Sequence, residues 1–295
     1  MIRKNIDVYT LIEPEIFKLR NVGVETASLD CRLLLTKSLN RHKILHNHEF
    51  INITNKEIKI FKSLIEQRLV GKPVSRIINK RNFWKMEFKL NEATLDPRCD
   101  SETLINAVLK HFTNKLQPLK ILDLGSGSGC LGLSLLHEYP NSEASFFDIS
   151  PKSLKMVKIN ALNLGLSERS QYINLNWKVN NWDKKLITIE NNIKYDVIIS
   201  NPPYVPTDVI KTLKKEVKNY DPFVALNGGK EGFDAFNSIL PKLINIIKSN
   251  GKIFIEIGKG QQSHVTSLAT GHGLLLKEYE KDLSGVTRVI ILNVK

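Results

Sequence analysis

The stretch ILDLGSGSG, residues 121–129, decides the fold, because a short apolar run leads into three closely spaced glycines. The apolar residues at 119–124 are typical of a buried strand, and a helix is expected to open after the last glycine. Glycine permits φ > 0 and lets the backbone approach a ligand without an intervening Cβ. Amides at a helix start favour an anionic group. A strand, a glycine loop and a helix in this order predict a ligand-binding turn.

Three kinds of ligand compete for this turn. No Lys-Ser/Thr pair follows the glycines, which excludes a P-loop. A dinucleotide fingerprint is harder to exclude, since Gly127, Gly129 and Gly132 also satisfy its spacing. Asp123 at the loop entrance decides against it, because a carboxylate would repel a pyrophosphate. The same carboxylate suits the ammonium and sulfonium charges of S-adenosylmethionine, which is the expected cofactor.

Asp148 ends the next strand-like run, at a distance from the glycine loop where an acidic residue commonly binds ribose hydroxyls. An alternative is that Asp148 caps the following helix. Ser150 can perform that capping, so we favour the ribose role for Asp148.

Apolar runs alternate with helical stretches from about residue 98 onward. The candidate strands lie at 119–124, 144–149, 172–177, 195–200, 252–257, 274–281 and 287–294. Helical stretches such as 151–164 and 232–248 separate them, which predicts a mostly parallel α/β sheet covered on both faces. Only residues 282–286 join the last two strands, too few for a parallel crossover, so these strands must form an antiparallel hairpin at the sheet edge. Methyltransferases have this arrangement, although other folds share it.

The chain divides into three regions of different character. Residues 1–73 carry apolar side chains at helical spacing and end near Gly71 and Pro73, which predicts a small helical bundle. Residues 74–97 are aromatic and alternating, which favours a hairpin linker. Residues 98–295 form the α/β domain.

Composition and charge indicate which partners and which cell location to expect. The net charge is +13, but lysine far outnumbers arginine and the bias extends over the whole chain, so we expect no direct nucleic-acid contact. No run reaches the roughly 18 apolar residues of a membrane span. The N-terminus lacks a signal-peptide core, so we expect a cytoplasmic location. We also expect a monomer. Three scattered cysteines and the His42/His46 pair do not make a convincing metal site or disulfide framework.

The second decisive motif is NPPY, residues 201–204, directly after the strand at 195–200. An amide nitrogen is a poor nucleophile, so a site that methylates one must accept its N–H protons and aim its lone pair. The Asn201 side-chain oxygen and the Pro202 carbonyl can accept those protons. Pro203 restricts the backbone, and Tyr204 offers a flat face for a planar group. NPPY therefore predicts a planar amide-type acceptor, either an amide or a nucleobase.

Six segments together resemble the PrmC/HemK family, the release-factor glutamine N5-methyltransferases, along almost the whole chain. They are GKPVSRIINKRNFW at 71–84, PRCDSE at 97–102, ILDLGSGSGCLGLSL at 121–135, ISNPPYV at 199–205, DPFVALNGG at 221–229 and YEKDLSGVTRVI at 279–290. NPPY alone is shared with DNA adenine and RNA guanine methyltransferases, whereas the combination is much more specific.

The resemblance implies a seven-stranded Rossmann-like class I S-adenosylmethionine-dependent methyltransferase domain with a small N-terminal helical domain. It implies methyl transfer to the N5 amide of the glutamine in the Gly-Gly-Gln motif of class 1 peptide chain release factors, leaving S-adenosylhomocysteine. The N-terminal helices would help dock the release factor.

The resemblance also implies roles for individual residues. With Asp123, the cofactor-binding residues would be Gly125, Ser126, Gly127, Ser128, Gly129, Asp148, Trp182 and Asn201. The catalytic residues would be Asn201, Pro202 and Tyr204, and these three with Pro203 would hold the acceptor glutamine.

Some residues depart from the family pattern, and some alternatives stay open. Cys99 and Ser101 replace Pro and Thr of the PRPDTE signature, although serine keeps the hydroxyl. Asn181 replaces the usual Asp before Trp182. Glu256, which ends an apolar strand, is ambiguous between a structural and a site role. The competing functions are an adenine N6 or guanine N2 methyltransferase, a glutamine methyltransferase of a ribosomal protein, and a cofactor-binding protein without catalysis.

Overall fold

The computed structural model describes residues 3–294, so residues 1, 2 and 295 of the expected terminal domains lie outside it. The chain forms two compact units, and each is considered by itself. One contains the residues up to Lys80 together with Lys214–Tyr220, and the other contains Arg81–Leu213 and Asp221–Lys295. Among the described residues, the helices are too short or too polar to cross a bilayer.

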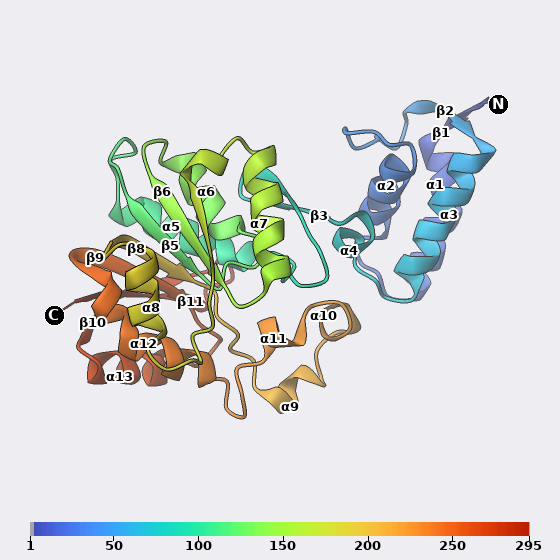
Figure 1. The fold of residues 1–295 in the computed structure, drawn as a ribbon. Coiled ribbons are helices and arrows are strands. Elements are labelled where there is room, and N and C mark those ends of the chain that lie inside the picture. Colours follow the sequence, from blue (N-terminus) through green and yellow to red (C-terminus); the bar gives the residue numbers. More distant parts are fainter. Residues whose placement is uncertain (1–2, 295) are drawn as a thin grey trace. The chain divides into compact units, whose positions relative to one another are not determined.

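The N-terminal unit is mostly helical (Figure 1). Its elements are β1 (Arg3–Asp7), α1 (Val8–Asn21), α2 (Ala27–Ser38), β2 (Phe50–Thr54), α3 (Asn55–Leu69), α4 (Val74–Ile78) and α10 (Lys215–Lys218). The strands β1 and β2, which the helical reading of the sequence missed, pair antiparallel. The sequence of β1, RKNID, has no alternation of apolar residues to reveal it. A capping box formed by Thr54 and Glu57 starts α3 where β2 ends.

The apolar faces of α1, α2 and α3 form the core of this unit, which includes Ile12, Leu34 and Phe61. A buried ion pair crosses it, because the Arg68 Nε donates to Asp30 Oδ2 at 2.7 Å. The Arg68 Nη1 also lies 2.6 Å from Glu216 Oε1, in α10. These contacts explain why a short segment far along the chain belongs to the N-terminal unit.

The second unit is built on a seven-stranded sheet with the order β10-β11-β9-β8-β5-β6-β7. Its strands are β5 (Lys120–Leu124), β6 (Glu143–Asp148), β7 (Ser170–Asn174), β8 (Tyr195–Ser200), β9 (Ile247–Glu256), β10 (Leu274–Lys281) and β11 (Thr287–Val294). The strands β5 to β9 run parallel, whereas β11 pairs antiparallel with both β9 and β10. This confirms the predicted parallel sheet and its antiparallel terminal hairpin.

Helices cover both faces of the sheet (Figure 1). On one face the core contains residues of α5 (Glu102–His111), α6 (Cys130–Glu138) and α7 (Pro151–Asn163). On the other face it contains residues of α8 (Trp182–Ile189), α12 (Asp234–Ile246) and α13 (Gln262–Gly271). The remaining elements are the hairpin β3 (Lys80–Phe83) and β4 (Met86–Lys89), the 3-10 turns η1 (Cys99–Ser101) and η2 (Ser167–Arg169), and the short helices α9 (Thr207–Ile210) and α11 (Phe223–Leu226).

The strand register brings the predicted site segments to one edge. Leu124 of β5 lies beside Phe147 of β6, and Ser200 of β8 lies beside Ile255 of β9. The glycine loop, Asp148, NPPY and Glu256 therefore begin at the carboxyl ends of neighbouring strands. The chain order reverses between β5 and β8, which is the switch point where open α/β sheets bind ligands.

Candidate active site

A cavity of about 350 Å³ opens at this edge of the sheet. Its size falls in the range of small-molecule sites. Its wall includes the glycine loop, the residues after β6, the residues after β7, the NPPY loop, and parts of the segments 93–101 and 223–235. Of the residues expected at the site, Gly125, Ser126, Gly127, Ser128, Asp148, Asn201 and Pro203 line the cavity. The others, Asp123, Gly129, Trp182, Pro202 and Tyr204, lie outside its lining.

Asp148 ties the glycine loop to the end of β6. Its Oδ2 accepts the Gly127 N–H at 2.9 Å, and its Oδ1 accepts the Ser150 N–H at 2.8 Å. Burial raises the pKa of the Asp148 carboxyl, while these two hydrogen bonds oppose the rise. Ser150 caps α7 through its own side chain. The buried hydroxyl of Ser126, also in the cavity wall, has no hydrogen-bond partner within residues 3–294.

Asp123 is buried behind the loop. Its Oδ2 accepts the Gly132 N–H at 2.9 Å, and its Oδ1 lacks a partner in the described part of the chain. Burial raises the pKa of Asp123 to about 7. The structure therefore gives Asp123 a contact with the first turn of α6.

Two tryptophans near β7 occupy different places. Trp182 is buried, donates its Nε1–H to the Ser238 carbonyl at 3.2 Å, and packs edge-on against Phe147. Trp177 lines the cavity and stacks on the same Phe147, with ring centroids 6.1 Å apart and planes at 6°. A Cβ on Gly125 would come within 2.9 Å of the Trp177 ring, and Gly125 has φ +83°, so this close approach requires glycine.

Sequence reasoning missed Trp177 and its neighbour Asn176 as cavity residues. The signal was present, because both residues follow the carboxyl end of β7, where ligands of such sheets bind. It also missed Phe223 and Val224 of α11, which are exposed apolar side chains in the cavity wall. Asp221, which precedes this helix, pairs its buried carboxylate with the guanidinium of Arg98, another residue of the cavity wall.

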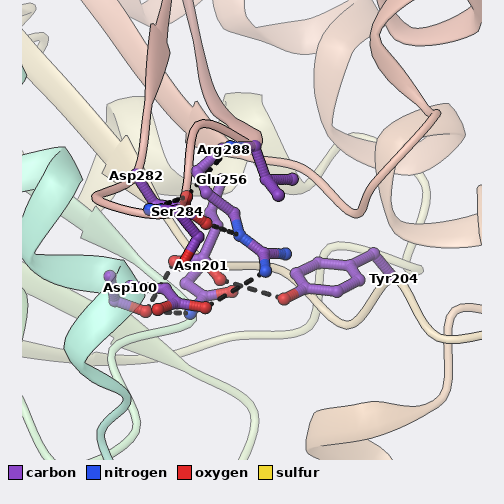
Figure 2. Close-up of polar contacts among 9 residues, drawn as sticks. Asp100, Asn201, Tyr204, Glu256, Asp282, Ser284 and Arg288 are labelled. Atoms are coloured by element: carbon purple, nitrogen blue, oxygen red, sulfur yellow. Dashed lines mark hydrogen bonds and ion pairs between the residues drawn. The ribbon is translucent and has the colours of Figure 1, made fainter.

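Asn201 is held by a chain of hydrogen bonds (Figure 2). Its Nδ2 donates to Ser101 Oγ at 2.9 Å, and Ser101 Oγ donates to Glu256 Oε2 at 2.5 Å. The Tyr204 hydroxyl donates to Glu256 Oε1 at 3.0 Å. Glu256 is therefore the residue where the contacts of Asn201 and Tyr204 meet.

Glu256 is fully enclosed at the end of β9. Burial raises the pKa of its carboxyl, whereas the hydrogen bonds from Ser101 and Tyr204 and the nearby Arg288 oppose the rise. Burial also raises the pKa of Tyr204, so its hydroxyl stays protonated and remains a donor.

Arg288, in β11, supplies positive charge near Glu256 (Figure 2). Its Nε donates to Asp282 Oδ2 at 2.8 Å, and its Nη2 donates to Asp100 Oδ2 at 3.1 Å. Asp100 and Ser101 are adjacent in η1, so one turn supplies both an Arg288 partner and the Asn201 partner.

The sheet order, the glycine loop after β5 and the NPPY loop after β8 define a class I S-adenosylmethionine-dependent methyltransferase fold. Residues 98–217 match the family model described as Methyltransferase small domain, and residues 16–78 match the one described as PrmC N-terminal domain.

Named relatives give a finer assignment. The chain is 33% identical over 277 residues to a release factor glutamine methyltransferase of Bradyrhizobium diazoefficiens, covering 92% of this chain and 90% of the relative. It is 32% identical over 276 residues to the protein of that name from Caulobacter vibrioides, covering 93% and 92%. A bifunctional methyltransferase of Rickettsia felis is 32% identical over 305 residues, covering 94% of this chain and 56% of the relative. The chain belongs to the PrmC family of release factor glutamine methyltransferases.

Proposed function

We propose that this enzyme transfers the methyl group of S-adenosylmethionine to the N5 side-chain amide of the glutamine in the Gly-Gly-Gln motif of class 1 peptide chain release factors. The observation that carries the proposal is the Asn201 carboxamide in the cavity wall, whose NH₂ group is engaged by Ser101. Its oxygen can then accept an N–H of an incoming amide. The names of the relatives favour a release factor over a nucleic acid or a ribosomal protein as the acceptor.

The residues around the cavity fit S-adenosylmethionine. The Asp148 carboxylate suits ribose hydroxyls, the Trp177 face suits an adenine, and the amides at the start of α6 suit the methionine carboxylate. When bound, the cofactor supplies a methyl group on a positively charged sulfur. Trp182 and Asp123 would then act from behind the wall, by supporting Phe147 and the first turn of α6.

The acceptor side works by orientation. The Asn201 oxygen and the Pro202 carbonyl would each accept one N–H of the glutamine amide, which turns the nitrogen lone pair toward the methyl group. Tyr204, fixed through its hydroxyl, would limit the tilt of the planar amide. Such positioning replaces a strong base, because holding two reactants in line removes much of the entropic barrier.

The N-terminal unit would dock the release factor. Its match to the PrmC N-terminal domain model supports this role. The monomeric state and the absence of nucleic-acid contact stay predictions from the sequence.

The test uses the full chain and radiolabelled S-adenosylmethionine. The acceptors are a class 1 release factor, its Gln→Ala variant at Gly-Gly-Gln, and total RNA and DNA. We expect label in the release factor alone and none in the Gln→Ala variant. Label in nucleic acid, or equal label in both release factors, would refute the proposal.

A further inference from the structure

The hydrogen bonds around Asn201 have a fixed direction, which follows from what each group can donate. While Glu256 is ionised its carboxylate only accepts, so Ser101 gives its single proton to Glu256. The Ser101 oxygen is then left as an acceptor, and it can pair with the Asn201 NH₂ but not with the Asn201 carbonyl oxygen. A flipped Asn201 would place two oxygen atoms against each other and would lose the hydrogen bond.

We propose that Ser101 and Glu256 are positioning residues that set the donor–acceptor polarity of the acceptor site by preventing the Asn201 carboxamide from flipping. The inference rests on the proposed function and deepens it. With Oδ1 turned to the acceptor, the site selects groups that bring N–H donors, such as a primary amide. With Nδ2 turned to the acceptor, it would instead face the amide protons with its own protons and repel them.

Burial raises the pKa of Glu256, so this polarity holds at a pH at which its carboxyl is ionised. The groups that face it are Ser101 from η1, Tyr204 from the NPPY loop, Arg288 from β11 and Asp100 from η1. Two of them donate hydrogen bonds to the carboxylate, and Arg288 provides the positive charge. The negative charge of Asp100 raises the pKa of Glu256. Asp100 also accepts a hydrogen bond from Arg288. The positioning therefore involves Arg288 indirectly, through the charge on Glu256.

Two substitutions separate polarity from packing. Ser101→Ala removes the hydroxyl that holds the Asn201 NH₂, whereas Ser101→Thr keeps a hydroxyl at the same place. Glu256→Gln keeps the volume but adds an NH₂, which can donate to Ser101 and free the serine proton for the Asn201 oxygen. Both orientations of Asn201 then become possible. A matched control is Ser134→Ala in α6, because Ser134 is buried and its hydroxyl has no hydrogen-bond partner among residues 3–294.

The kinetic test measures kcat with a release factor at saturating cofactor. We expect Ser101→Ala to lower kcat at least tenfold, toward the order of a hundredfold that small misplacements cause. Glu256→Gln, which leaves the productive orientation partly populated, should lower kcat by a smaller factor. Ser101→Thr should restore kcat to within about threefold of the wild type, and Ser134→Ala should leave it unchanged. A merely structural role predicts equal losses for the alanine and threonine variants, and that result would overturn the inference.

A second readout does not depend on activity. In ¹⁵N-resolved NMR spectra, the Asn201 side-chain NH₂ pair is identified by its loss in Asn201→Asp. One of its protons should exchange slowly in the wild type and in Ser134→Ala, and fast in Ser101→Ala. Unchanged exchange in Ser101→Ala would overturn the inference even if the wild type proved inactive on release factors. Inactivity of the wild type would by itself refute only the proposed function.

Discussion

The two sides of the cavity are built by different means. On the cofactor side, backbone amides are bound by carboxylates, the Gly127 amide by Asp148 and the Gly132 amide by Asp123. On the acceptor side they are contacts between side chains from distant segments, Ser101, Asn201 and Glu256. The shape of the cofactor side depends on glycines, because a Cβ at Gly125 or Gly132 would collide with neighbouring side chains. The arrangement of the acceptor side depends on which of its side chains donate hydrogen bonds and which accept them.

The largest expected effect is a loss of methyl transfer after a substitution on the acceptor side of the cavity. Asn201→Ala removes the oxygen that would accept the amide N–H, and we expect methyl transfer to fall on the order of a thousandfold, as when one preorganised polar group is lost from an active site. Cofactor affinity, measured by calorimetry, should change much less. Normal methyl transfer by this variant would show that Asn201 does not orient the acceptor amide as proposed.

The next effect separates the two tryptophans of the cofactor side. Trp182→Ala should lower the free energy of unfolding by about 3 to 5 kcal/mol, because a large buried side chain is lost. Trp177→Ala should mainly weaken cofactor binding, by the roughly 1–3 kcal/mol of a lost stacking contact, which is about 5- to 150-fold in Kd. Chemical denaturation and calorimetry on both variants test this. An exchange of the two outcomes would place the adenine near Trp182.

A smaller effect tests the space behind the glycine loop. A Cβ on Gly132 would meet the Phe146 ring at 2.5 Å and Asp123 Oδ2 at 3.0 Å. We expect Gly132→Ala to cost about 1–3 kcal/mol of unfolding free energy. Gly271→Ala, at the end of α13, is the control, since its Cβ would have no atom within 4 Å, and its effect should stay within about 1 kcal/mol. Equal effects of both substitutions would contradict the close packing.

A further effect is a dependence of stability on pH, which is at most about 1.4 kcal/mol for each pH unit. The pKa of Asp123 is about 7 in the folded protein and near 3.8 when unperturbed. Between these values the folded state binds more protons, so the stability contribution of Asp123 falls as pH rises from about 4 to 7, by no more than about 1.4 kcal/mol per pH unit. Asp123→Asn keeps an acceptor for Gly132 and should flatten the curve of unfolding free energy against pH. An unchanged slope would mean that Asp123 titrates normally.

The difference between the two sides also explains what the sequence predicted. The parallel sheet, its terminal hairpin and the glycine loop were predicted because glycine spacing and apolar runs are local patterns. The relation of Ser101 to Asn201 and Glu256 was not, because 100 and 155 residues separate these partners. Glu256 stayed ambiguous for the same reason, since nothing near β9 indicates what lies opposite its side chain.

Two local features also escaped prediction. The placement of Trp177 in the wall and Trp182 in the core depends on where β7 ends, at Asn174, whereas the apolar pattern extends the strand through residue 177. The strand β1 is polar and becomes visible only through its pairing with β2. The roles assigned to individual site residues stay predictions.

The helix α10 has a consequence for how the protein can be rearranged. The chain leaves the sheet-bearing unit after Leu213 and returns to it at Asp221, and the intervening segment belongs to the N-terminal unit. Neither unit is a continuous piece of sequence. A gene fusion or truncation that cuts only near residue 80 would separate Arg68 from Glu216. The short helix α10 would then remain in the loop after NPPY without its ion-pair partner. Exchange of the N-terminal unit between relatives, by recombination or by design, must therefore carry both segments together.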